Sequence, residues 1–558
     1  MIKAIPCALL IALSCHCFGQ GGQPDKKPRK TGEVEEAEVV IEKSRAITLP
    51  EADRNYEKIG KSTTKENPML RPYQYTDYTL KLADLNPKFR ILQMPTDAAG
   101  DQTGNYVKAG LSNYMGLLGE GYFNSTRNQD YSYGAKAKLL SFGQGPVDRA
   151  NSSSSEGFLG VHGKYFTSAL TASAALEYSR RLYHFYGYRP GSVGRDRDDR
   201  RDIRHAFSTI GVKTSFANAD AESDLDYKLD VNVFNLSDNY NAREFEFGTS
   251  LTGRYKLSDL LGAGLDADLF LTRVSDRGSV NRNLFRLKPR LYYGNGDNLS
   301  VSVGLNIVYQ NDTLNSSTAL NLLPSVEAQY TLAESFTVFA GFDGDVQRTT
   351  LRQLSTENPW LEPNVPLANT LKGRELYAGF KGRVAGDLSF AARLGYAGYK
   401  NLYFYVNSVT DTSKFTLAYD PEFTGVVNFT GELSYNAADK FRLSAKVDFF
   451  NFNPPNQEEA WHRPKFTTTL LGKYNLSQKL SFDTEIYYLG GIAAKNFVTN
   501  RKSELEPIVD MNLKAEYAVF ERLSAFLALN NLLNQKYQRF LYYPNRGLTI
   551  MLGATYSF

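Results

Sequence analysis

Cysteine and histidine are scarce in this chain of 558 residues. All three cysteines, Cys7, Cys15 and Cys17, lie at the extreme N-terminus. If this leader is removed, the remaining chain has no thiol, which excludes disulfides, thiol catalysis and cysteine metal sites. The five histidines are scattered without metal-ligand spacing. We therefore expect no metal site and no cofactor.

Long apolar runs are also missing. No stretch approaches the roughly 18 to 20 apolar residues of a membrane helix, which excludes a helical membrane protein. The net charge is only +4, with Lys and Arg interspersed among Asp and Glu, so we expect no nucleic-acid partner. No Ser/His/Asp set suggests an enzyme. Aromatic residues, by contrast, make up 13% of the chain, which suits β-strands and membrane-interface belts.

The first residues predict a targeting segment. Lys3 precedes a short apolar run over residues 4–13, which is typical of a secretory signal. A small residue, Gly19, offers a cleavage site, so we expect a signal peptide over 1–19 and a mature chain that begins at Gln20. The alternative is lipoprotein processing, because residues 12–15 loosely resemble a lipobox that would lipidate Cys15.

Strict two-residue alternation marks many segments. In 441–449 the odd positions are apolar, whereas the even positions are Arg, Ser, Lys and Asp. The run 225–233 repeats this design, and further copies begin at residues 299, 336, 388 and 466. A membrane barrel needs this pattern, because one face meets lipid and the other a polar lumen. A soluble β-sandwich would also alternate, so the pattern alone does not decide.

The connections decide between the two. Tight turns, which often follow a tyrosine, alternate along the chain with long polar loops such as 144–156, 189–203, 347–372, 451–465 and 490–504. This predicts an all-β, transmembrane, antiparallel up-and-down β-barrel over 104–558, with short periplasmic turns and long extracellular loops.

Eleven hairpins can be counted, which predicts about 22 strands with both barrel ends on the periplasmic side. The expected pairs are 104–114 with 117–126, 131–142 with 156–166, 168–184 with 203–216, 226–235 with 242–256, 261–273 with 283–294, 298–309 with 318–331, 335–347 with 372–384, 387–405 with 414–436, 440–451 with 463–475, 479–490 with 504–517, and 521–531 with 546–558.

The last strand alternates and ends on Tyr556 and Phe558. A terminal aromatic after such a strand resembles the signal by which the barrel-assembly machinery recognises its clients. Together with the signal peptide, this predicts the outer membrane of a Gram-negative bacterium, with outer-membrane lipid around the barrel.

The stretches 530–537 and 543–547, followed by the terminal strand, resemble the C-terminal hairpin of TonB-dependent receptors. That resemblance implies a 22-stranded barrel, in agreement with the hairpin count. It also implies import of a solute across the outer membrane, driven by the TonB complex of the inner membrane.

One part of that family pattern is missing. Residues 20–103 are too few for the folded plug that such receptors carry ahead of the barrel. We expect this segment to be periplasmic or lumenal and partly disordered. Within it, Glu38, Val39, Val40 and Ile41 faintly resemble a TonB box. The alternative for these four residues is an exposed, β-prone piece of linker.

A barrel this wide without a plug would leak, so something should close it. The 347–372 loop, which contains Trp360, could fold inward or bind a ligand; the alternative is a mobile surface loop. Arg195 and Arg197 could contact an anionic or metal-bearing ligand, whereas the balanced charge of their loop favours a solvated loop.

Two functions follow from these observations. The first is a receptor-like barrel that admits a solute across the outer membrane, coupled to TonB or acting as a gated pore. The alternative is a plugless structural or interaction subunit of an outer-membrane complex, with a partner such as an outer-membrane lipoprotein.

Overall fold

The computed structural model describes residues 104–558 except 126–129, 221–222, 277, 295–297, 312–318, 334, 385–386, 438–439 and 497–499. The predicted signal peptide, the segment 20–103 and the box-like residues 38–41 lie outside the described residues.

The architecture is one sheet of 22 strands, joined in chain order by antiparallel pairing. The strands are β1 (Tyr106–Ser112), β2 (Gly116–Asn124), β3 (Tyr131–Phe142), β4 (Ser154–Phe166), β5 (Leu170–His184), β6 (Arg204–Asn218), β7 (Leu225–Asp238), β8 (Arg243–Lys256), β9 (Leu261–Ser275), β10 (Ser279–Gly294), β11 (Leu299–Gln310), β12 (Leu320–Ala333), β13 (Phe336–Gln347), β14 (Thr370–Val384), β15 (Leu388–Lys400), β18 (Thr424–Ala437), β19 (Phe441–Asn453), β20 (Phe466–Asn475), β21 (Leu480–Gly490), β24 (Ile508–Phe520), β25 (Leu523–Asn530) and β28 (Thr549–Ser557).

The sheet closes on itself because β1 pairs with both β2 and β28. At this seam Tyr106 lies opposite Ser557, so the first and last strands meet at the end that carries the short turns. Closure leaves no open edge, which a sheet surrounded by lipid requires. The predicted closed barrel of about 22 strands is confirmed.

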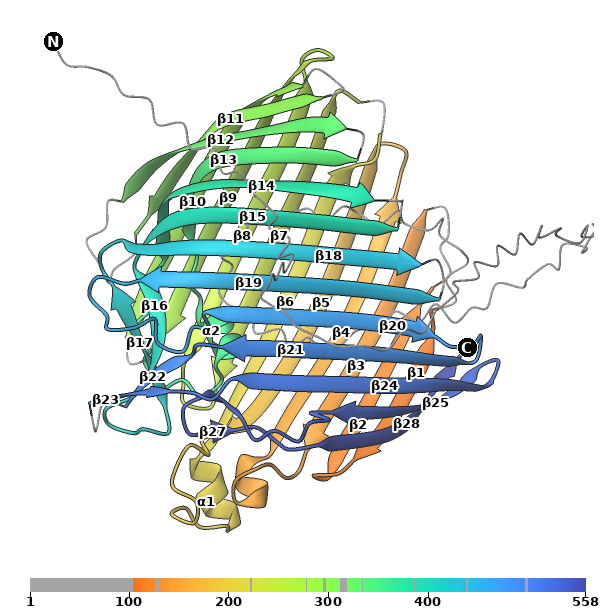
Figure 1. Cartoon of the computed structure of the whole chain (residues 1–558), viewed down its shortest axis with the longest axis vertical. Coiled ribbons are helices and arrows are strands. Elements are labelled where there is room, and N and C mark those ends of the chain that lie inside the picture. The colour runs from red at the N-terminus through yellow and green to blue at the C-terminus, as the bar shows by residue number, and fades with distance from the viewer. Residues whose placement is uncertain are drawn as a thin grey trace, which may run out of the picture. The chain divides into compact units, whose positions relative to one another are not determined.

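The remaining elements all lie in loops. They are η1 (Arg149–Ser152), α1 (Arg197–Asp202), α2 (Leu351–Glu357) and the strand pairs β16 (Leu402–Asn407) with β17 (Phe415–Asp420), β22 (Ala493–Asn496) with β23 (Arg501–Glu504), and β26 (Gln538–Phe540) with β27 (Tyr543–Pro544). Figure 1 shows β16, β17, β22 and β23 gathered at one end of the barrel, with the C-terminus at the other. Among the described residues, no helix is long and apolar enough to cross a membrane.

The wall has an apolar outer face. Outward side chains such as Leu159, Leu394 and Leu552 are 57, 57 and 62% exposed, whereas the alternate positions carry the ion pairs described below. A closed barrel that is apolar outside and polar inside is the architecture of outer-membrane proteins. It places the chain in the outer membrane of a Gram-negative bacterium.

Two predicted strands are shorter than expected. The pair 387–405 and 414–436 breaks at Asn401, whose φ of 58° turns the chain out of the wall. The residues beyond the break form β16 and β17, which pair with each other instead of with the barrel. All six residues of β16 are buried. An apolar run without alternation fits neither the lipid face nor the lumen, so it leaves the wall to form a core.

Candidate functional site

Six long loops pack together at one end of the barrel and share hydrophobic cores. We call this structure the cap. Its loops span residues 185–203, 348–369, 401–423, 454–465, 491–507 and 531–548. Buried side chains from the last five form three clusters, and the partly buried Tyr186 of the first loop packs against one of them. Loops normally expose their polar backbone to water. Here the loops instead cover one another across the end of the barrel.

The β16–β17 hairpin is the centre of the cap. On one side Phe415, which is fully buried, donates its backbone N–H to the Trp360 carbonyl (2.8 Å) and accepts from the Glu362 N–H (2.8 Å). On the other side, the Arg463 guanidinium donates two hydrogen bonds to the Tyr403 carbonyl (2.8 and 3.2 Å). The hairpin therefore ties the 348–369 loop to the 454–465 loop.

Aromatic rings fill the space between the loops. Trp360 stacks on Tyr543 with ring centroids 3.9 Å apart, and Tyr186 packs edge-on against both. The Trp360 indole N–H also donates to the His184 carbonyl at the end of β5 (3.0 Å). Trp360, predicted as an inward-folding or ligand-contacting residue, is thus partly buried and packs against the cap core. Ligand contact by this residue stays a prediction.

A partly buried carboxylate joins α2 to the hairpin. Glu357 accepts hydrogen bonds from the hydroxyls of Tyr405 (2.7 Å) and Tyr403 (2.8 Å) and from the Gln353 amide (3.0 Å). Burial raises the pKa of Glu357, against the lowering effect of these donors. Glu244 of β8 accepts two backbone N–H groups at the start of α2, at 2.8 Å each, which anchors the helix to the wall.

His462 connects three loops. Its Nδ1–H donates to the Tyr405 carbonyl (2.7 Å) and its Nε2 accepts from the Leu541 N–H (3.3 Å), so the neutral ring satisfies both contacts. Its backbone N–H donates to Ala493 (2.7 Å), and its carbonyl accepts from Arg539 (2.7 Å). Burial, assisted by the charge of Arg539, lowers the pKa of His462 to about 3.

This pKa predicts that the cap weakens in mild acid. An unpacked His462 binds a proton below about pH 6.5, whereas the packed ring stays neutral down to about pH 3, so cap stability should fall as the pH drops through this window. The loss at pH 5 should be ~2 kcal/mol, measured by hydrogen–deuterium exchange of the cap loops at pH 7.5 and 5.

His462→Asn is the matched variant for this experiment. The φ of His462 is 55°, a backbone conformation that asparagine tolerates, and the new side chain does not titrate. The cap of this variant should no longer weaken as the pH falls below 6.5.

Glu357 acts in the opposite sense. Because its pKa is raised in the cap, its contribution to cap stability is lost as the pH rises above the ordinary pKa of a glutamate. An unchanged pH dependence in the variant would show that His462 is not the group responsible.

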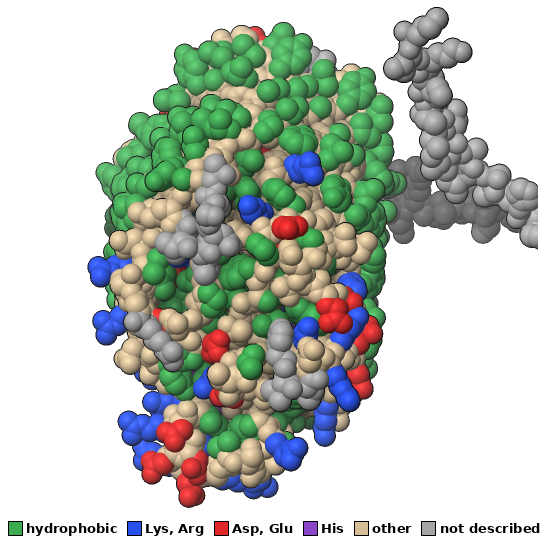
Figure 2. Space-filling view, turned by 90° about the vertical axis from the view of Figure 1, so that its left-hand side faces the viewer, with side chains coloured by type: hydrophobic (Ala, Val, Ile, Leu, Met, Phe, Trp, Pro, Cys, Tyr) green, Lys and Arg blue, Asp and Glu red, His purple; other side chains and the backbone are tan. Residues whose placement is uncertain are grey.

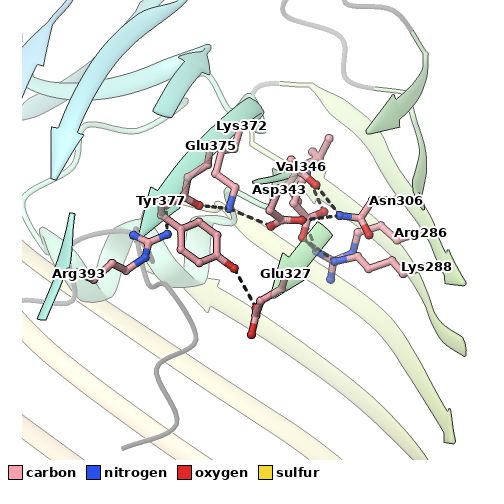
Figure 3. A network of polar contacts seen from close by, with 12 residues as sticks. Arg286, Lys288, Asn306, Glu327, Asp343, Val346, Lys372, Glu375, Tyr377 and Arg393 are labelled. Atoms are coloured by element: carbon pink, nitrogen blue, oxygen red, sulfur yellow. Dashed lines mark hydrogen bonds and ion pairs between the residues drawn. The ribbon is translucent and has the colours of Figure 1, made fainter. Parts of the chain in front are cut away.

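Polar side chains line the inner wall of β9 to β15 (Figure 3). Two carboxylates, Asp345 and Glu375, are each shared by two cations. The ion pairs are Arg286–Asp268 (2.9 Å), Arg286–Asp345 (3.4 Å), Lys288–Asp345 (2.6 Å), Lys372–Asp343 (3.2 Å), Lys372–Glu375 (2.7 Å) and Arg393–Glu375. Tyr377 adds a hydrogen bond to Glu327 (2.9 Å). This wall is therefore charged but largely self-neutralising.

The two arginines predicted as ligand contacts lie away from the cap core. Arg195 pairs with Asp148 (2.8 Å), and the Gly191 N–H donates to the same carboxylate (3.0 Å). These two bonds hold the pKa of Asp148 below its ordinary range. Arg197 is exposed at the start of α1. In Figure 2, which views the loop end, charged side chains gather toward the bottom, where Figure 1 places α1. Ligand binding by either arginine stays a prediction.

The receptor-like stretch 530–537 forms a tight turn. Asn531 and Asn534 have φ values of 51° and 52°, and the Asn531 amide donates to the carbonyls of Gln535 and Arg546 (2.9 Å each). The hydroxyl of Tyr537 donates to Asp510 of β24 (2.7 Å). The motif thus holds the base of the last cap loop.

The remaining predicted residues lie on the outer wall or outside the described chain. Tyr556 and Phe558 are 48 and 51% exposed, and their rings stack at 6.2 Å. Recognition of these aromatics by the assembly machinery stays a prediction. Among the described residues, no three His, Cys, Asp or Glu side chains form a group that could hold a metal.

The sequence predictions missed Phe415, Glu357 and His462. One signal could have found the hairpin: the run Leu402–Val406 is apolar at every position, which breaks the alternation of the surrounding strands. Glu357 and His462 carry no such local mark, because the tyrosines that donate to Glu357 lie 46 and 48 residues away and the partners of the His462 ring lie 57 and 79 residues away.

No protein-family model matches this chain, and no curated protein matches it. Solved structures do match its fold. The FrpB iron transporter of Neisseria meningitidis (F3-3 variant) is 11% identical over 81% of this chain and 81% of its own, with a TM-score of 0.62. The siderophore receptor PirA of Acinetobacter baumannii is 11% identical, with 81 and 80% covered and a TM-score of 0.62. The ferric-catecholate import receptor Fiu of E. coli K12 is 11% identical, with 81% of each chain covered and a TM-score of 0.59. At such identities the likeness shows the fold alone.

Proposed function

We propose that this chain is a receptor-like barrel that admits a solute across the outer membrane, and that its cap is the external gate. The observation that carries the proposal is the cap itself, in which six loops share buried cores at one end of a 22-stranded barrel. A barrel of this size without an obstruction leaves a wide aqueous channel. The structural neighbours named as iron transporters and siderophore receptors support a transport role.

Removing the central hairpin tests the gate. Leu402 and Asp420 are paired, so a short Gly-Ser turn can replace residues 403–419 without moving the wall. We expect the full-length protein to be closed in planar bilayers and the hairpin variant to conduct ions, because the cap loses the contacts that join its loops. Replacing residues 190–201 with a Gly-Ser linker of equal length is the control, because this stretch contributes no side chain to the cap cores.

The other outcomes are informative. A hairpin variant that stays closed would contradict the cap as the sole barrier; deletion of residues 21–103 then tests whether the N-terminal segment obstructs the lumen. If both changes together leave the barrel closed, the protein is better explained as the structural or interaction subunit. If the unaltered protein is already a wide open pore, the gate proposal is wrong.

We propose further that Glu38, Val39, Val40 and Ile41 contact TonB. The support is their likeness to a TonB box together with the receptor fold. A cysteine at Val40 should cross-link to TonB in energised cells, whereas a cysteine at Gln23, outside the box, should not. Equal cross-linking at both positions, or none at Val40, would count against coupling.

A further inference from the structure

Lysines gather on the inner wall of β1, β3 and β4. Lys108, Lys136, Lys138 and Lys164 alternate with outward residues, of which Val107, Leu139 and Tyr165 are 54, 42 and 56% exposed on the lipid face. Because successive side chains of a strand point to opposite faces, these four lysines face the lumen. We call them the lysine wall.

Pairing brings three of them around one carboxylate. Lys108 lies opposite Glu120 of β2, and Glu120 lies opposite Lys138 of β3. Neighbouring strands are ~4.8 Å apart and alternate residues ~7 Å apart, so the backbone positions of Lys108, Lys136 and Lys138 lie within about 7 to 12 Å of one another. Lys164 lies farther toward the short-turn end, opposite Ser132.

None of these lysines has an ion-pair partner within 4.0 Å among the described residues. Glu120 instead accepts a hydrogen bond from the Tyr106 hydroxyl (2.6 Å). Lys108 and Lys136 contact the Phe526 and Phe158 rings, at 4.6 and 5.9 Å from the centroids. Lumenal lysines on other strands do pair with carboxylates, including Lys228–Asp230 (2.8 Å), Lys288–Asp345 (2.6 Å) and Lys514–Glu516 (2.8 Å).

Among the described residues, Glu120 is the one carboxylate paired across the strands with these lysines, so the charge of the lysine wall is only partly compensated there, in contrast to the self-neutralised wall of Figure 3. Like charges held this close repel, and the repulsion is strongest beside a low-dielectric protein wall. Several positive charges facing an aqueous lumen concentrate anions. A single monovalent anion can offset only part of this charge, whereas a multiply charged one can contact several lysines at once.

We propose that the lysine wall binds multiply charged anions, solutes that carry several carboxylate or phosphate groups, within the lumen. This inference rests on the proposed function, because it assigns a chemical class to the solute that the barrel admits. It places the binding surface on strands β1 to β4 and not in the cap.

Titration calorimetry with inorganic tripolyphosphate tests the proposal on the full-length protein in nonionic detergent at low salt. The test variant is Lys108→Gln/Lys136→Gln/Lys138→Gln. The control is Lys213→Gln/Lys228→Gln/Lys446→Gln, which removes the same charge from lysines that have carboxylates within 4.0 Å. The test variant should bind at least about tenfold more weakly, a loss of ~1.4 kcal/mol, and the control less than twofold more weakly.

Salt supplies a second measurement on the unaltered protein: the affinity should fall steadily as salt screens the lysines. Equal weakening in the two triple variants, or no binding by the unaltered protein, would overturn the proposal. The conductance of the hairpin variant separates the two hypotheses. If the hairpin variant conducts ions but the protein binds no anion, the proposed function stands and the lysine-wall proposal fails. If the protein binds the anion but the hairpin variant stays closed, the lysine-wall proposal stands and the gate fails.

Discussion

Replacing Phe415 with alanine should release the cap while the barrel remains folded. Phe415 has no exposed surface, and its ring packs edge-on against His462 and Phe540, with centroids 5.3 and 5.4 Å away. Truncation of a fully buried phenylalanine costs about 3 to 5 kcal/mol, because apolar burial is lost and a cavity remains. The cap lies on loops, so we expect this cost to appear as local opening.

Hydrogen–deuterium exchange measures that opening directly. Protection of residues 348–369 and 401–423 should fall by about 3 to 5 kcal/mol, whereas exchange in the barrel strands should not change. Phe423→Ala is the matched control, because Phe423 lies in the same loop but is 49% exposed. An equal loss of protection in both variants, or a loss that extends through the barrel wall, would show that Phe415 does not hold the cap specifically.

The second large effect concerns the wall. Glu375→Gln should lower the free energy of unfolding of the barrel by about 3 kcal/mol, the lower end of the cost of breaking a buried ion pair from one side. Glu375 is the carboxylate shared by Lys372 and Arg393, and these three side chains are only 9, 12 and 2% exposed. The glutamine keeps the shape of the side chain but removes the negative charge that faces both cations.

Asp230→Asn provides the comparison. Its partner Lys228 is 54% exposed and Asp230 itself 32% exposed, so the loss of this pair should cost less than about 1 kcal/mol. Urea unfolding of both variants in lipid vesicles measures the difference. Similar shifts of the unfolding midpoint would mean that solvent in the lumen screens Glu375 as effectively as it screens Asp230.

The barrel could be predicted from the sequence because its determinants are local. In the run 441–449 the type of each residue indicates which side of the wall it faces: apolar residues face lipid and polar residues face the lumen. The observed β19 covers that whole run. The short turns and long loops alternate along the chain, so the number of strands follows from counting. Even the seam could be expected, because an even number of strands brings the first and last to the same end.

The cap could not be predicted in the same way. Trp360 and Tyr543 are far apart in the sequence and each lies in a polar-looking loop, yet their rings stack at 3.9 Å. Of the long loops, only 347–372 was considered as one that could fold inward, and the other local indication is the apolar run that became β16. Likewise, alternation predicted lumenal lysines on many strands, but not which of them would lie near a carboxylate.

The sequence by itself therefore determined the closed barrel, its strand number and its membrane setting, because side-chain alternation, turn length and chain order act over a few residues. Only the tertiary structure decided that six loops share a core at one end of the barrel and that the lysine wall lacks ion-pair partners among the described residues. Both depend on which strands and loops the closed barrel brings together. Contacts between segments that are distant in the sequence produce no periodic pattern of residues, so the sequence alone does not reveal them.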